Sequence, residues 1–306
     1  MTSSAELHAG VSASVATAGV TIFAMPKAFA GHIGVIQRNA ITSWTRMCPR
    51  PQIILFGDDA GTAEVAAAFE VQHVPYVARN EQGTPLVNDL FDQARRLAEH
   101  RLLAYVNADI ILLGDFLTAV RRMHAAPFEC FLLIGRRIDM DITKPLDFDG
   151  DWERSLRNKA AQHGKLAARV CKDYFVFPQS EFGEVPAFAI GRANWDNWMV
   201  YHAHTQDMPV VDATRVITAI HQNHGYSHLV GGRNEAYVKG AEAKCNKKLA
   251  GGMHLVRGSA ANWLLTPSTL RRSRSPSALV PFLADSVAFA KLLFELFGRN
   301  KGAPST

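Results

Sequence analysis

The feature that most constrains this chain is a repeated alternation of short apolar, β-prone runs with segments of helical spacing. Such runs lie at residues 20–25, 52–56 and 102–106, and each is closed by turn-forming residues. Between them, apolar residues recur three and four positions apart, as on the buried face of a helix. Parallel strands need a crossover connection, which is usually a helix. The alternation therefore predicts an α/β fold with a mostly parallel sheet flanked by helices.

The remaining elements follow from the same patterns. We expect helices over residues 33–47, 62–69 and 85–100, and further strands over residues 74–78, 131–135, 210–212 and 217–220. The segment 139–165 is polar, charged and irregular, and we interpret it as a mobile lid near the cleft.

Length and composition set the domain organisation. The chain has 306 residues and a hydrophobic content of 48%, which is enough to bury a full core. We expect a loose N-terminal arm over residues 1–18, a catalytic domain over residues 19–235 and a C-terminal extension over residues 236–306. Within this helical extension we expect a basic linker at 271–276 and an amphipathic helix at 279–297.

Several classes of protein are disfavoured by composition. The 33 basic and 28 acidic residues are too balanced for a dedicated nucleic-acid binder, although an anionic substrate or membrane surface stays compatible. The four cysteines form neither a CxxC zinc pattern nor a disulfide framework. We expect no secretory signal and no membrane-spanning helix. A cytoplasmic location is expected, with peripheral membrane contact or a homo-oligomer through the C-terminal helix as open alternatives.

Polar side chains follow two of the predicted strands. Asp109 ends the turn after residues 102–106, where a carboxylate can bind a hard cation that neutralises a diphosphate. Asp58 and Asp59 follow residues 52–56, where they could accept hydrogen bonds from a base or a ribose. The structural alternatives are an Asx turn for the first and a helix N-cap for the others. Because ligands bind at the carboxyl ends of parallel strands, we place the candidate site there.

The order of these features resembles a known family. Strand, helix, a strand with a terminal Asp, and a later strand ending in the DxD-like turn Asn107-Ala108-Asp109 look like the donor half of GT-A glycosyltransferases, over about residues 18–230. The resemblance implies a Rossmann-related fold with a donor half over 19–115 and an acceptor half over 116–235. It implies transfer of a sugar from a nucleotide-sugar donor to a hydroxyl, in glycan or polysaccharide assembly. Asp109 matches the family's principal metal-binding position, whereas Asn107 replaces the first acid.

The same resemblance implies a metal-binding histidine in the acceptor half. His221 and His224, with His228 beyond them, follow a predicted strand, and we expect at most one ligand among them, with His224 ahead of His221. Neutral imidazole suits Mn²⁺ better than Mg²⁺, so the expected cofactor is a divalent cation with Mn²⁺ favoured. The alternative is a polar loop in which the histidines cap backbone or face solvent.

A catalytic base is implied for an inverting enzyme of this family. Asp196 matches that place by its order in the chain, and Trp195 and Trp198 could stack on sugar faces of the acceptor. The alternative is an aromatic core segment in which Asp196 caps a helix beginning at Asn197. A retaining enzyme would not need this base.

Two basic residues complete the candidate site. Lys27 follows the first strand and Arg192 follows Gly191, and each could pair with the diphosphate of the donor, with ordinary surface charge as the alternative.

Two other functions remain open. A sugar-phosphate nucleotidyltransferase would normally show a glycine-rich phosphate loop after the first strand, and residues 24–31 lack one. The second open function is that of a non-catalytic carbohydrate-binding protein on the same fold. For the enzyme, the expected partners are a nucleotide-sugar donor and a carbohydrate or lipid-linked acceptor.

Overall fold

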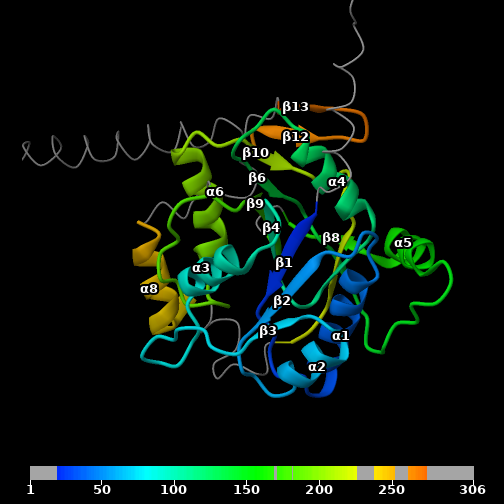
Figure 1. Cartoon of the computed structure of the whole chain (residues 1–306), viewed down its shortest axis with the longest axis horizontal. Coiled ribbons are helices and arrows are strands. Elements are labelled where there is room, and N and C mark those ends of the chain that lie inside the picture. The colour runs from blue at the N-terminus through cyan, green and yellow to red at the C-terminus, as the bar shows by residue number, and fades with distance from the viewer. Residues whose placement is uncertain (1–18, 169–170, 181, 226–237, 252–260, 274–306) are drawn as a thin grey trace, which may run out of the picture.

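The computed structural model describes residues 19–168, 171–180, 182–225, 238–251 and 261–273 (Figure 1). The expected N-terminal arm, His228 and the expected helix at 279–297 lie outside these ranges. None of the helices in the described part of the chain has the length and apolar character needed to span a bilayer.

A nine-stranded sheet forms the centre of the molecule, in the order β13-β12-β10-β6-β9-β4-β1-β2-β3. Its strands are β1 (Val20–Ala24), β2 (Gln52–Phe56), β3 (Gln72–Val74), β4 (Leu102–Val106), β6 (Leu132–Ile134), β9 (Tyr174–Pro178), β10 (Val210–Asp212), β12 (Trp263–Leu265) and β13 (Leu270–Arg272). All neighbours pair in parallel except β9, which is antiparallel to β4 and β6, and β13, which is antiparallel to β12. The expected α/β fold with a mostly parallel sheet flanked by helices is confirmed.

Helices cover both faces of this sheet. They are α1 (Gly31–Thr45), α2 (Thr62–Ala68), α3 (Val87–Leu97), α4 (Asp115–His124), α5 (Trp152–His163), α6 (Trp195–Thr205) and α8 (Ala241–Leu249). In Figure 1, α3, α6 and α8 lie on one side of the sheet, and α1, α2 and α4 lie on the other. Because both faces are covered, β1 and β4 are buried at every position, which explains their continuous apolar sequences.

A second, four-stranded sheet joins the main one beside α1 and α5. It has the order β5-β11-β7-β8, with β5 (Ile110–Leu112), β11 (Ala219–Gln222), β7 (Ile138–Met140) and β8 (Lys165–Leu166). The strand β11 pairs antiparallel with β5 and parallel with β7. Since β5 begins directly after Asp109, this sheet brings the acceptor half of the chain against the strand-end turn.

Two expectations about local structure before residue 170 are wrong. The strand expected at 74–78 is instead β3, which ends at Val74, because β2 pairs with residues 72–74. The segment 139–165 is not irregular: it contains β7 and α5, and α5 buries Leu156 and Ala160 against the second sheet. The buried amide of Asn39 also binds the backbone of this segment.

The C-terminal part of the chain adds to the main sheet. The strand β12 pairs with β10, and β13 extends the edge, so Arg271 and Arg272 lie in a strand where we expected a linker. The pairing of β12 with β10 joins segments far apart in the chain, which local composition does not reveal, and β13 then pairs with the adjacent β12.

Candidate functional site

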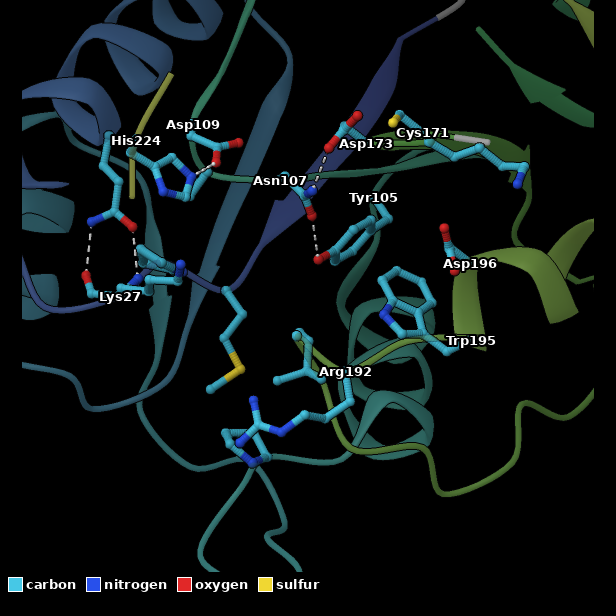
Figure 2. Close-up of a pocket in the computed structure, with 18 of the residues that line it drawn as sticks. Lys27, Tyr105, Asn107, Asp109, Cys171, Asp173, Arg192, Trp195, Asp196 and His224 are labelled. Atoms are coloured by element: carbon cyan, nitrogen blue, oxygen red, sulfur yellow. Dashed lines mark hydrogen bonds and ion pairs between the residues drawn. The ribbon is translucent and has the colours of Figure 1, made fainter. Parts of the chain in front are cut away.

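A cavity of about 510 Å³ opens at the edge of the main sheet where several strands end (Figure 2). Lys27 follows β1, Asp59 follows β2, and Asn107 and Asp109 follow β4, so the carboxyl ends of three parallel strands supply one wall. The opposite wall is residues 190–197, at the start of α6. Glycine is required where β2 turns toward this site, because Gly57 has a φ of 95°.

Asp109 is fixed in its turn by backbone and side-chain contacts. Its carbonyl oxygen accepts a hydrogen bond of 3.1 Å from Nε2 of Gln222 in β11. Its side-chain Oδ2 lies 2.9 Å from Nε2 of His224 and 3.6 Å from Nε2 of His221. Its other oxygen, Oδ1, is buried without a hydrogen-bond partner in the described part of the chain.

The two histidines and Lys27 set the charge of this carboxyl. Burial raises the pKa of Asp109, but the hydrogen bond with His224 and the charges of His221, His224 and Lys27 outweigh it and lower the pKa. The hydrogen bond with Asp109 raises the pKa of His224. Burial lowers the pKa of Lys27, against the opposing effect of Asp109. The carboxylate form of Asp109 is therefore favoured.

These groups fit a divalent metal ion. One ligand atom from each of Asp109, His221 and His224 lies within 4.8 Å of the others. Two imidazoles and a carboxylate can together bind a divalent cation, and the unpartnered Oδ1 of Asp109 has a free lone pair for such an ion. We expected at most one histidine here, whereas the structure brings His221 and His224 to the same carboxylate oxygen.

Asn107 lies in the same turn but is engaged by protein groups. Its Oδ1 accepts a hydrogen bond of 2.8 Å from Oη of Tyr105, and its Nδ2 donates one of 2.9 Å to Oδ1 of Asp173 (Figure 2). Asp173 also forms an ion pair of 2.6 Å with Arg137. Burial raises the pKa of Asp173, and Arg137 opposes this. The amide of Asn107 is thus oriented by its neighbours and stands back from the two histidines.

Asp196 lies on the opposite wall, in the first turn of α6 (Figure 2). The helix begins at Trp195 and its N-cap is Asn194, so Asp196 is not the capping residue of the structural alternative. Burial raises the pKa of Asp196, and the nearby Lys172 opposes this. Lys172 is itself buried and donates a hydrogen bond of 2.7 Å to Oδ1 of Asn197. The carboxyl of Asp196 therefore lines the cavity beside a buried cation.

The two tryptophans of α6 occupy different positions. Trp195 lines the cavity with its ring edge-to-face against Tyr105, at a centroid distance of 5.2 Å. Trp198 is not among the described residues that line the cavity, and it stacks on His202 at 4.5 Å. Both indoles are buried in the core, and because residues three apart on a helix are offset by about 60°, the two rings point in different directions.

Of the remaining predicted residues, Asp59 and Arg192 line the cavity, whereas Asp58 is not among the described residues that do so. Asp59 lines the cavity, and burial raises its pKa. Asp58 is exposed and forms an ion pair of 2.5 Å with Arg79. Arg192 lines the cavity, but its guanidinium forms an ion pair of 2.7 Å with Glu242 of α8. The helix after these acids is preceded by Gly61, so neither Asp58 nor Asp59 is its N-cap.

Four contributors to the site were missed by the sequence reasoning. They are Tyr105, Arg137, Lys172 and Asp173. Tyr105 belongs to an apolar strand, and the other three carry charges that a sequence pattern assigns to the surface. The only sequence signal was the unusual polarity of the segment just before β9.

No protein-family model and no curated protein matches the chain. Among solved structures, the chain is similar to glucosyl-3-phosphoglycerate synthase from Mycobacterium tuberculosis, in complex with Mn²⁺, uridine diphosphate and phosphoglyceric acid, at 10% identity and a TM-score of 0.47, over 78% of this chain and 81% of that chain. It is similar to the mannosyltransferase PcManGT from Pyrobaculum calidifontis, in complex with GDP-Man and Mn²⁺, at 13% identity and a TM-score of 0.41, over 79% and 63%. It is also similar to S. aureus TarS at 7% identity and a TM-score of 0.39, over 67% and 58%. The chain thus spans less than two thirds of the last two structures.

Proposed function

We propose that this protein is a glycosyltransferase that moves a sugar from a nucleoside diphosphate sugar to a hydroxyl of a carbohydrate or lipid-linked acceptor. The observation that carries the proposal is that one cavity has two chemically different walls. One wall presents Asp109, His224 and Lys27, with His221 beside the same carboxylate, a set suited to a metal-bound diphosphate. The other presents Asp196, a carboxyl suited to accept a proton.

The donor would lie along the ends of β1, β2 and β4. Lys27 would pair with the diphosphate, and its backbone is already held by reciprocal hydrogen bonds of 2.7 Å to the side chain of Gln37. Asp59 would accept hydrogen bonds from the nucleoside, because its carboxyl lines the same wall. Arg192 would reach the diphosphate only after leaving Glu242, so we assign it to the cavity wall.

Asp109, His221 and His224 would hold a divalent cation, with Mn²⁺ favoured by the two imidazoles. When bound, such an ion supplies positive charge that stabilises the departing diphosphate. His224 must release its Nε2 proton to become a ligand, so ligand formation is favoured as pH rises.

Asp196 would act as general base in an inverting reaction. The acceptor oxygen forms a bond to the anomeric carbon, the bond from that carbon to the diphosphate oxygen breaks, and the acceptor proton passes to Asp196. Burial raises the pKa of this carboxyl, which makes it a better proton acceptor once ionised. Trp195 would border the acceptor and exclude water from the reacting atoms.

The test is a thermal-shift screen of uridine and guanosine diphosphates, and of their sugar conjugates, with and without Mn²⁺. A ligand at 100 times its Kd stabilises the native state by about 2.7 kcal/mol, which gives a measurable rise in Tm. We expect a nucleotide-dependent rise that requires Mn²⁺ and is lost in Asp109→Asn. The matched control is Asp149→Asn, which removes an exposed loop carboxylate and should keep the shift.

A nucleotide sugar that raises the Tm in this way is then tested for turnover by following release of the nucleoside diphosphate. Binding and turnover that survive Asp109→Asn unchanged would refute this assignment of the donor site. Metal-dependent binding without turnover on any hydroxyl acceptor would instead favour a binding protein on the same fold.

A further inference from the structure

Asp139 is a carboxylate that is not among the described residues lining the cavity, yet it faces the proposed metal site through the small sheet. It lies in β7, and the parallel register pairs it directly with His221 of β11. The antiparallel register of β11 and β5 pairs His221 with Ile110, the residue after Asp109. Three strands thus bring Asp139, His221 and Ile110 into one row, with Asp109 next to Ile110 in the chain.

The imidazole of His221 lies between two carboxylates. Its Nε2 is 3.6 Å from Oδ2 of Asp109, and its Nδ1 is 3.1 Å from Oδ1 of Asp139. The contact between Nδ1 and Oδ1 of Asp139 is short enough for an ion pair, but its angle is not that of a hydrogen bond. A small rotation of the ring would align it, and such contacts often tighten when a site is filled. The ring is therefore oriented with Nε2 toward Asp109 and Nδ1 toward Asp139.

The orientation of Asp139 is itself fixed. Nε of Arg137 donates a hydrogen bond of 2.8 Å to Oδ1 of Asp139, and Nη1 of Arg137 pairs at 2.6 Å with Asp173. Asp173 in turn accepts from Nδ2 of Asn107. Arg137 thus bonds Asp139 directly, and it is connected to the turn that carries Asp109 through Asp173 and Asn107.

We propose that Asp139 is a positioning residue for the metal site: it holds Nδ1 of His221 so that the neutral ring offers the lone pair of Nε2 to a divalent cation. Metal-binding histidines usually donate their other ring N–H to a carboxylate or a carbonyl, which fixes the tautomer and the ring orientation. The inference rests on the proposed metal site.

His224 provides an internal comparison. Its Nε2 also faces Asp109, and its Nδ1 lies 3.0 Å from the carbonyl oxygen of Gly225. A backbone carbonyl cannot be removed by substitution, whereas the carboxylate behind His221 can. Asp139 is therefore the position at which this kind of support can be tested.

The experiment measures Mn²⁺ affinity without nucleotide, from the electron paramagnetic resonance signal of the free ion, so that it does not depend on turnover. We expect Asp139→Ala to weaken the affinity by about 10- to 100-fold, the range typical of such supporting groups. Asp139→Asn should lose less, because its amide oxygen can still accept from Nδ1–H. Asp149→Asn, an exposed carboxylate in the following loop, is the charge-matched control and should bind as wild type.

A double-mutant cycle separates positioning from a general structural role. If Asp139 acts through His221, Asp139→Ala should change the affinity less than about 2-fold in a His221→Ala background, since interacting residues are not additive. An equal loss in both backgrounds, or no loss in either, would overturn the proposal. Circular dichroism and the Tm of each metal-free variant establish that the titrated protein is folded.

The proposed metal site and the proposed role of Asp139 can be refuted separately. If wild type and Asp109→Asn bind Mn²⁺ equally, the metal site itself is wrong, and the role of Asp139 falls with it. If Asp109→Asn loses the ion and Asp139→Ala does not, only the inference about Asp139 is refuted.

Discussion

A buried amide behind the metal site allows a prediction of stability from single contacts. Gln222 is fully buried. Its Nε2 donates to the carbonyl oxygen of Ile36 at 2.7 Å and to that of Asp109 at 3.1 Å, and its Oε1 accepts from Nδ2 of Asn39 at 2.9 Å. One side chain therefore joins α1, β11 and the turn that carries Asp109.

Replacing Gln222 with Leu keeps the approximate volume and removes three buried hydrogen bonds, while the carbonyl of Asp109 still accepts from the backbone N–H of residue 222 and Nδ2 of Asn39 still donates to the carbonyl of Lys144. A hydrogen bond contributes about 0.5–1.5 kcal/mol net, so the loss of three should lower the free energy of unfolding by about 1.5–4.5 kcal/mol. That is a large part of the roughly 5–15 kcal/mol that stabilises a typical protein. Gln72→Leu, at an exposed position of β3, is the control and should stay within about 0.5 kcal/mol of wild type.

The measurement is urea unfolding followed by circular dichroism, in which a lower midpoint at constant slope reports a loss of stability. The bond between Asn39 and Gln222 is lost in either single variant, so the double variant with Asn39→Leu should be less destabilised than the sum by about 0.5–1.5 kcal/mol. A loss below about 1 kcal/mol for Gln222→Leu would show that these contacts do not hold the turn, because it would fall below the loss expected for three hydrogen bonds. Strict additivity would show that the two amides are not coupled.

Four further outcomes follow from the proposed site. Asp196→Asn should lower kcat by about 10²–10⁴-fold with the donor KM unchanged, and steady-state kinetics against the exposed control Asp207→Asn check this. Because burial raises the pKa of Asp196 and a base must be ionised, kcat/KM should fall on acidification with a midpoint above that of an exposed aspartate. Lys172→Met removes the opposing charge, so the pH profile should shift to higher pH; an unmoved profile would exclude Asp196 as the titrating base. Glu242→Ala removes the 2.7 Å partner of Arg192 and should reduce stability by about 1–3 kcal/mol in urea unfolding, because both side chains are partly exposed.

The parts of the fold that were predicted correctly depend on local sequence. The strands β2 and β4 and the helices α1 to α3 follow from apolar periodicity and from the turn residues that end each run. The position of Asp109 at a strand end follows equally, because the apolar run before it stops there. The strand near residue 74 was misplaced because its limits depend on pairing with β2 rather than on its own composition.

The site residues also divide into those that local sequence placed correctly and those that only the tertiary structure placed. The chain order of Lys27, Asp59 and Asp109 placed them at one sheet edge, and all three line the cavity. Spacing alone did not decide which of Trp195 and Trp198 faces that cavity, because both fit an aromatic helix face. The rotation of α6 against the core decides it: both indoles are buried, but of the two only Trp195 is among the described residues that line the cavity.

By itself, the sequence determined an α/β chain whose polar strand ends gather along one edge, because the alternation of strands and helices is written in local apolar periodicity. Tertiary structure alone decided the chemistry of the Asp109 turn. The register of β5, β11 and β7 sets His221 between Asp109 and Asp139, and the chain path after β11 brings His224 to the same oxygen. A register is fixed by contacts between segments far apart in the chain, and shifting it by one residue would turn these side chains to the opposite face.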